Sequence, residues 1–411
     1  MQLGVNEFDV GWVRGDMRIC TLALLLLLVL GTHSTAAIFE EDICLQAEKE
    51  LYSGRGIHLF TECLKVPELN KLEMAYAYYC RGLAYAYARE YYKSIVDFDM
   101  SIIINPYSSL VYSDRGNSYF EIGESEQAIA DWNKAILLDP GNPHPYVSMG
   151  YDHYLKKEYV QAIEFFNTAI KYNPKYALAY NNRGLAYHAL GEYIKAIADY
   201  NEAILIDPML AWAYNNRGGT YSKIEKYQQA LSDYNKAIKI NPRLGRTYNN
   251  RGLTHARMGQ HQQALTDFSK AVELESDNSE VYYNRGLTYN ILGNHQKAIQ
   301  DYIMAIRIDP KLSKAHNNLA FTYATANPPQ LRNMEEALSH AVIAVQLTLG
   351  EDCASLDTLA SVYAMTGLFD MAVEVGQQAV NLANRNGNIK ETKRLEQSLE
   401  LYKSGITPSG L

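Results

Sequence analysis

The sequence predicts an all-α solenoid of stacked helical hairpins, because two independent markers share one period. Prolines recur with a spacing of 34 residues or a multiple of it, with Ser276 where one more proline would stand: Pro106, Pro140, Pro174, Pro208, Pro242 and Pro310. Glycines keep the same spacing: Gly82, Gly116, Gly150, Gly184, Gly218, Gly252 and Gly286. Such a period is typical of units that cannot bury their own apolar face and therefore stack on neighbours.

The stretch from 177 to 210 shows why each unit is a hairpin. One helical stripe with i, i+3, i+4 and i+7 spacing carries Tyr180, Arg183, Gly184 and Tyr187. Gly191 ends this first helix, and a second helix starts at Tyr193, with Ala196, Tyr200 and Ala203 on its inward side. Asp207 and Pro208 end the second helix, because proline cannot continue the hydrogen-bond ladder and disfavours helical geometry before it.

This pattern resembles the tetratricopeptide repeat, a 34-residue helix–turn–helix unit. The second unit shows the match at Tyr112, Gly116, Tyr119, Gly123, Ala128, Trp132, Ala135 and Pro140. The resemblance covers residues 75 to about 386 and implies an all-α, right-handed superhelical solenoid of about nine units plus terminal capping helices. The eighth unit is interrupted by "ANPPQLRN" at 326–333, which is either a binding loop or a neutral insertion.

The regions outside the array have distinct predicted roles. Residues 1–36 resemble a secretory signal peptide, since Arg14 and Arg18 precede an apolar run from 19 to 30 and then small residues. The run is shorter than a membrane-spanning helix, and translation starts at Met1 or at Met17. Residues 37–74 are expected to form an N-terminal helical cap, residues 75–386 the repeat array, and residues 387–411 a C-terminal capping helix and tail.

Two cysteines of the N-terminal cap are placed so that they can meet. Cys44 and Cys63 flank the turn signal "SGRG" at 53–56, and antiparallel helices on either side would bring them to similar heights. They are therefore either a disulfide, as an exported protein allows, or two small buried side chains.

An arginine on the inward stripe is costly unless it is paired. An aspartate follows each such arginine by sixteen residues, and we expect six pairs: Arg81 with Asp97, Arg115 with Asp131, Arg183 with Asp199, Arg217 with Asp233, Arg251 with Asp267 and Arg285 with Asp301. Where Met149 replaces arginine, Phe165 replaces aspartate. The pairs are predicted to stabilise the hairpins and not to bind a ligand.

Stacking would align other first-helix residues into rows. In the family this side of the first helices lines a concave groove that binds extended peptides or partner helices. The peptide-binding candidates are Asn181, Asn182, Asn215, Asn216, Asn249, Asn250, Asn284, Asn317, Asn318, Leu185, Leu253 and Leu287. An asparagine offers both donor and acceptor to a peptide backbone. The alternative is that these amides only bridge neighbouring helices. Earlier units offer Tyr79, Phe120, Tyr151 and Tyr154, which suggests a more aromatic end.

The composition and motifs favour a binding protein over an enzyme. The net charge of -8 argues against nucleic acid as the main partner. No Gly-rich phosphate loop, nucleophile elbow or metal-spaced histidine group occurs in the sequence. We therefore expect no catalytic residue, metal or cofactor, no membrane span in the mature chain, and a protein or peptide partner outside the cytoplasm. The alternatives are an assembly factor that self-associates through its ends, or the targeting subunit of an enzyme complex.

Overall fold

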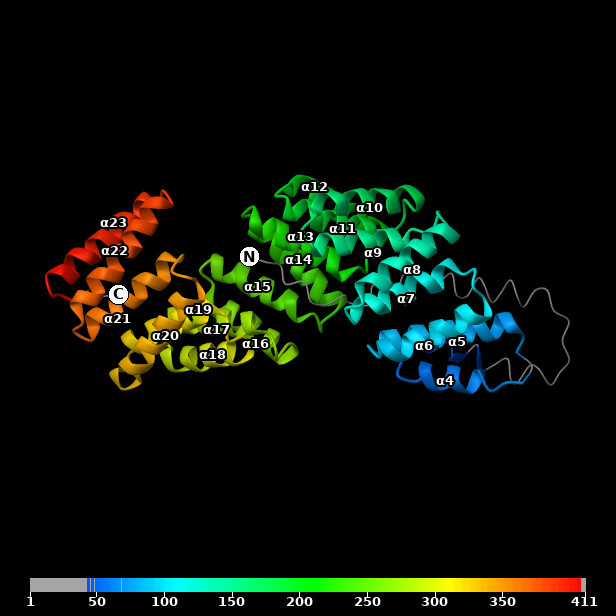
Figure 1. Cartoon of the computed structure of the whole chain (residues 1–411), viewed down its shortest axis with the longest axis horizontal. Coiled ribbons are helices and arrows are strands. Elements are labelled where there is room, and N and C mark those ends of the chain that lie inside the picture. Colours follow the sequence, from blue (N-terminus) through cyan, green and yellow to red (C-terminus); the bar gives the residue numbers. More distant parts are fainter. Residues whose placement is uncertain (1–42, 45, 48, 68, 408–411) are drawn as a thin grey trace. The chain divides into compact units, whose positions relative to one another are not determined.

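The computed structural model describes residues 43–44, 46–47, 49–67 and 69–407, and within these ranges all regular structure is helical (Figure 1). The α-helices are α4 (Gly56–Cys63), α5 (Lys71–Tyr87), α6 (Tyr91–Ile104), α7 (Ser109–Glu121), α8 (Ser125–Leu138), α9 (His144–Leu155), α10 (Tyr159–Tyr172), α11 (Ala177–Ala189), α12 (Tyr193–Ile206), α13 (Ala211–Lys223), α14 (Tyr227–Ile240), α15 (Gly245–Arg257), α16 (His261–Leu274), α17 (Ser279–Ile291), α18 (His295–Ile308), α19 (Ser313–Thr325), α20 (Met334–Leu347), α21 (Cys353–Met365), α22 (Phe369–Arg385) and α23 (Ile389–Lys403). A short 3-10 helix, η1 (Pro329–Leu331), lies between α19 and α20. The predicted all-α class is confirmed.

The chain divides into two compact units, residues 1–220 and 221–411, and the division falls within α13. In the first unit, consecutive helices pack as the hairpins α5–α6, α7–α8, α9–α10 and α11–α12. In the second unit, the hairpins are α15–α16, α17–α18, α19–α20 and α21–α22, and α23 packs on α22. In each unit a hairpin contacts the next one along the chain, as a stacked array requires.

The inward-facing glycines lie directly against an aromatic ring of the second helix. A Cβ atom built on Gly184 would stand 2.7 Å from the ring of Tyr200, and one on Gly252 would stand 2.8 Å from the ring of Phe268. Tyr200 and Phe268 are fully buried. A larger residue at these glycines would clash with the ring and force the two helices of the hairpin apart. Close packing of the two helices therefore explains why a glycine recurs every 34 residues.

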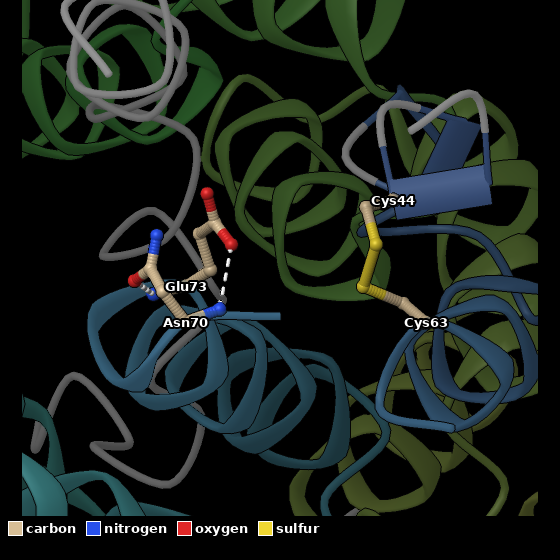
Figure 2. Close-up of a disulfide and its surroundings, with 4 residues drawn as sticks. All are labelled: Cys44, Cys63, Asn70 and Glu73. Atoms are coloured by element: carbon tan, nitrogen blue, oxygen red, sulfur yellow. Dashed lines mark hydrogen bonds between the residues drawn. A yellow bond between two sulfur atoms is a disulfide. The ribbon is translucent and has the colours of Figure 1, made fainter. Parts of the chain in front are cut away.

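The N-terminal cap is held by a disulfide between Cys44 and Cys63, whose Cα atoms are 5.1 Å apart (Figure 2). Of the two interpretations of these cysteines, the bond is therefore the one that the structure shows. Helix α5 then begins with a capping box. The Asn70 side-chain oxygen accepts a hydrogen bond from the backbone N–H of Glu73, and the backbone N–H of Asn70 donates to the Glu73 carboxylate. Phe60 of α4 packs with Tyr79 and Cys80 of α5. The predicted signal segment lies outside the described residues.

At the C-terminal end of the described residues, α23 packs on α22. Leu395, Leu399 and Tyr402 of α23 are buried in one cluster with Ala379 and Ala383 of α22. The interruption at 326–333 connects the two helices of the eighth hairpin. Its Arg332 side chain donates to the carbonyl of Ala326 at 2.9 Å, and Asn333 caps α20.

Candidate functional site

The inward arginines are paired with aspartates wherever both residues belong to one compact unit. Each guanidinium donates two hydrogen bonds of 2.6–2.9 Å to the two carboxylate oxygens, in Arg81–Asp97, Arg115–Asp131, Arg183–Asp199, Arg251–Asp267 and Arg285–Asp301. The aspartate side chains are only 4–8% exposed. Five of the six predicted pairs are thus confirmed. Arg217 and Asp233 fall on opposite sides of the division between the units, and their pairing stays a prediction.

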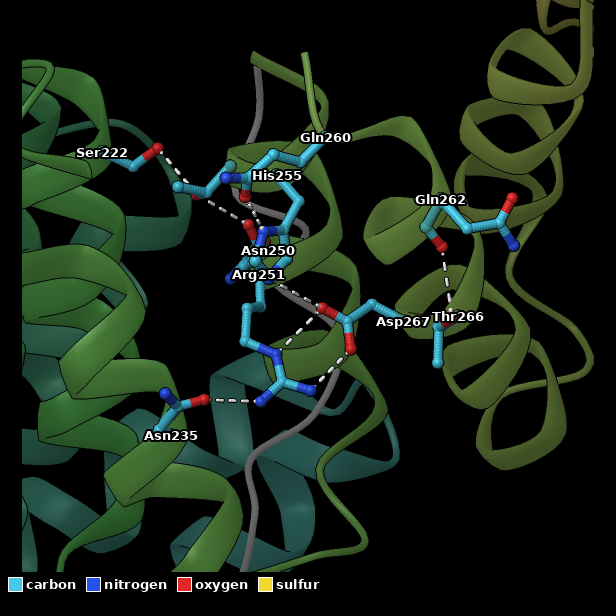
Figure 3. A network of polar contacts seen from close by, with 10 residues as sticks. Ser222, Asn235, Asn250, Arg251, His255, Gln260, Gln262, Thr266 and Asp267 are labelled. Carbon is cyan, nitrogen blue, oxygen red and sulfur yellow. Dashed lines mark hydrogen bonds and ion pairs between the residues drawn. The ribbon is translucent and has the colours of Figure 1, made fainter. Parts of the chain in front are cut away.

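A third bond, which the sequence did not lead us to expect, joins three of these arginines to the hairpin before. The remaining guanidinium nitrogen Nη1 of Arg251 donates to Asn235 of α14 at 2.6 Å, while Asp267 lies on α16 (Figure 3). Arg183 and Arg217 bind Asn167 and Asn201 in the same way. Each asparagine precedes its arginine by sixteen residues, and this second regular spacing was the available signal.

A tyrosine face completes the environment of each arginine. The guanidinium carbon lies 5.4–5.6 Å from the ring centre of the tyrosine three residues earlier, in six units from Tyr78 to Tyr282. Hydrogen bonding to Asp301 raises the pKa of the Arg285 guanidinium above its ordinary value. The repeated tyrosine and arginine are therefore explained by packing within and between hairpins, and the arginines have little capacity left for a ligand.

Where the arginine is replaced, the pair is replaced as a whole. Met149 and Phe165 pack in one apolar cluster with Trp132, and Leu359 and Val375 pack in another. The eighth hairpin differs, because Leu319 and His340 occupy the two positions and His340 bonds to His316 instead.

Within each compact unit, side chains of the asparagine rows form hydrogen bonds between successive first helices. Asn216 donates to Asn181, and Asn284 donates to Asn249, at 3.0 and 3.1 Å. Asn318 donates to the hydroxyl of Tyr283 at 3.2 Å. Neighbouring amides bond as well, as Asn181 does to Asn182. The bridging of neighbouring helices, which was the alternative interpretation, is therefore present.

Burial separates the candidate residues into two groups. Asn181, Asn182 and Asn215 are less than 10% exposed, which leaves a ligand little surface on them. The other nine candidates are half-buried: Asn216, Asn249, Asn250, Asn284, Asn317, Asn318, Leu185, Leu253 and Leu287. The carbonyl oxygen of the Asn317 side chain has no partner among the described residues.

Three of the four aromatic side chains expected to line the earlier hairpins are buried, and the fourth, Phe120, is half-buried. Tyr79, Tyr151 and Tyr154 are 8–9% exposed and belong to the apolar clusters of the first unit. Phe120 packs against the ring of Trp132 at 5.7 Å. These rings fill the space between helices because their stripe faces the next hairpin, and a stripe pattern alone does not distinguish that packing from exposure.

Two kinds of site are absent from the described part of the chain. It contains no group of three or more His, Cys, Asp or Glu residues that could hold a metal ion. Within the same ranges, every helix is too short or too polar to cross a membrane.

Comparisons with known proteins agree with this geometry. A family model described as "TPR repeat" matches residues 116–156, 150–191 and 184–224, and one described as "Tetratricopeptide repeat" matches residues 211–244, 245–278 and 279–312. The chain is therefore a tetratricopeptide repeat protein. Such repeats serve protein–protein interaction, so the fold defines an interaction scaffold.

Several solved structures are similar to parts of the chain. YrrB, described as "a TPR protein with an unusual peptide-binding site", is 24% identical, with a TM-score of 0.35, over 45% of this chain and 95% of its own. TTC0263 from Thermus thermophilus is 22% identical, with a TM-score of 0.40, over 44% and 100%. MamA is 24% identical, with a TM-score of 0.35, over 40% and 96%. A comparison with curated protein sequences finds no match.

Proposed function

We propose that this protein is a non-enzymatic scaffold that binds an extended peptide or a partner helix along its first helices. The observation that carries the proposal is the continuity of that face. Helix α15 contacts α17, and α17 contacts α19. Asn284 and Asn318 each form a hydrogen bond with the first helix of the preceding hairpin. Leu253 and Leu287, one turn after Asn249 and Tyr283, continue the same face and are half-buried.

The two residue types have different roles in this proposal. The bonds between these amides fix the spacing of the first helices. An asparagine side chain can donate two hydrogen bonds and accept others, so Asn284 and Asn318 have more capacity than their one bond between helices uses. The leucines supply the apolar contact area. In the second compact unit a partner would thus be held through its backbone by the amides and through its side chains by Leu253 and Leu287.

A peptide-display selection tests the proposal without knowledge of the natural partner. Linear peptides are first selected on the purified parent protein. Their affinity for a double variant, Leu253→Asp with Leu287→Asp, is then compared with their affinity for the parent protein. The matched control is Gln228→Asp combined with Gln262→Asp, two exposed positions on the second helices. Loss of binding by at least about tenfold (about 1.4 kcal/mol) in the leucine variant alone supports the proposal. Equal binding to all three proteins contradicts it, provided that circular dichroism shows each is folded.

We also propose that the protein acts outside the cytoplasm. The basic, apolar and small-residue pattern of residues 14–36 and the Cys44–Cys63 disulfide support this location. Mass spectrometry of the protein from its native source tests both features. We expect an N-terminus near residue 37, and we expect that Cys44 and Cys63 are alkylated only after reduction. A full-length N-terminus with two alkylated thiols would contradict export.

A further inference from the structure

The eighth hairpin replaces the repeated tyrosine, arginine and aspartate with two histidines and a leucine. His316 of α19 stands at the tyrosine position, Leu319 at the arginine position, and His340 of α20 at the aspartate position. The Nδ1 atoms of the two imidazoles are 2.9 Å apart. His316 is 4% exposed and the His340 side chain 18%, so their contact joins the two helices inside the hairpin.

The hydrogen-bond partners define where the protons are. His316 Nε2 lies 3.2 Å from the carbonyl oxygen of Pro310, which only accepts, so this nitrogen carries the hydrogen. Neutral His316 then has a bare Nδ1 that accepts. His340 must therefore donate from Nδ1, and its Nε2 is the bare nitrogen. The two helices are joined by a bond that exists only while His316 Nδ1 stays unprotonated.

The charged groups around the pair are few. Asp309, before α19, and Glu336, on α20, are the carboxylates that act on the histidines, and Glu336 lies 3.7 Å from His340 Nε2. A first proton can add to His340 Nε2 beside Glu336 without breaking the contact. A second proton can add only at His316 Nδ1, where it would set two N–H groups against each other.

We propose that the eighth hairpin is a pH-sensitive joint, in which protonation of the His316–His340 pair in mildly acidic solution loosens α20 from α19. Hairpins held by arginine and aspartate stay closed in the same range. Helix α20 packs on both α19 and α21, so loosening here would weaken the contact between the eighth hairpin and the ninth.

The direction of the pH effect follows from burial. Desolvation lowers the pKa of both His316 and His340. The unfolded chain therefore binds more protons than the folded hairpin just below the ordinary histidine pKa of about 6.5. The contribution to stability is complete above that pH and is lost as the pH falls below it.

Hydrogen exchange of the full chain, corrected for intrinsic rates, tests the joint at pH 7.5 and pH 5.5 with a chelator present throughout. We expect the protection of α20 amides to fall by at least about threefold on acidification. The control is α7–α8, which contains the Arg115–Asp131 pair and no histidine, and whose protection should not change. A variant with His316→Tyr, Leu319→Arg and His340→Asp copies the trio Tyr282, Arg285 and Asp301 and should lose the pH effect.

Three outcomes would overturn the joint. They are unchanged α20 protection at pH 5.5, an equal fall in α7–α8, and an equal fall in the triple variant. If the variant does not fold, nitrogen-15 NMR of the histidines in the parent protein decides the question. At pH 7.5 we expect the hydrogen of His316 on Nε2 and that of His340 on Nδ1. The opposite tautomers would remove the basis of the proposal.

Discussion

At the scale of single residues, the repeated arginine joins three helices. Arg251 uses two nitrogens for Asp267 in its own hairpin and the third for Asn235 in the hairpin before, with Tyr248 against its face. All three of its nitrogens thereby donate within the protein. The recurrence of this side chain follows from the need to fix both the closure of a hairpin and its distance from its neighbour.

A double-mutant comparison tests whether the arginine and aspartate act as a pair. Arg251→Met should lower the free energy of unfolding of this hairpin by about 3 kcal/mol, because it removes both guanidinium hydrogen bonds from the buried Asp267 carboxylate. Arg251→Met with Asp267→Phe should cost less, since it copies the apolar pair Met149 and Phe165. Urea unfolding followed by circular dichroism measures both. Equal losses in the two variants would show that the pairing is not what stabilises the hairpin.

The sequence permitted the first half of this network to be predicted but not the second. The sixteen-residue offset between arginine and aspartate stays within one hairpin, where the turn fixes which residues are level. The bonds to Asn235, and between Asn284 and Asn249, cross from one hairpin to the next. Their partners depend on how far one hairpin is rotated relative to its neighbour, and a periodic pattern does not give that rotation.

At the scale of the helices, the turn inside each hairpin needs one residue with left-handed backbone geometry. Gly123, Gly191 and Gly259 take this position with φ between 75° and 85°. Lys157 and Glu225 hold the same place in other units with φ of 63° and 62°. The repeat predicted a glycine at the turn. In the hairpin of Gly191, for example, the first helix ends at Ala189 and the second begins at Tyr193. Its replacements tolerate a conformation that costs a residue with a side chain about 1–2 kcal/mol.

Restoring glycine at such a turn should therefore stabilise the protein. Glu225→Gly should raise the free energy of unfolding by about 0.5–1 kcal/mol, because relief of the left-handed geometry exceeds the added freedom of the unfolded chain. The control is Lys226→Gly, the next residue, whose φ is -82° and which should gain nothing. Thermal unfolding by calorimetry compares them. A lower melting temperature for Glu225→Gly than for the parent would contradict this explanation of the turn.

At the scale of the whole chain, stability is distributed unit by unit. Within each compact unit every hairpin contacts the next along the chain, and the apolar clusters follow one another. A disturbance at one end is therefore expected to stay near that end. The disulfide between Cys44 and Cys63 suits this arrangement, because α4 is only 8 residues long.

Removal of the disulfide tests this locality. Cys44→Ser with Cys63→Ser should destabilise the N-terminal cap by about 2–4 kcal/mol, as expected when a loop of this length is opened in the unfolded state. Hydrogen exchange should rise in α4 and α5 and remain unchanged in α17 and α18. A uniform rise along the chain would show instead that the array unfolds as one cooperative body.

The arginine bonds also bear on how such a gene could change in length. Deletion of residues 202–235 would remove Asn235 and bring Asn201 sixteen positions before Arg251, with Asp267 still sixteen positions after it. The same kinds of bond would then form, with Asn201 in the place of Asn235. Duplication of 34 codons regenerates them equally well, so copies can be gained or lost in evolution without inventing a new joint.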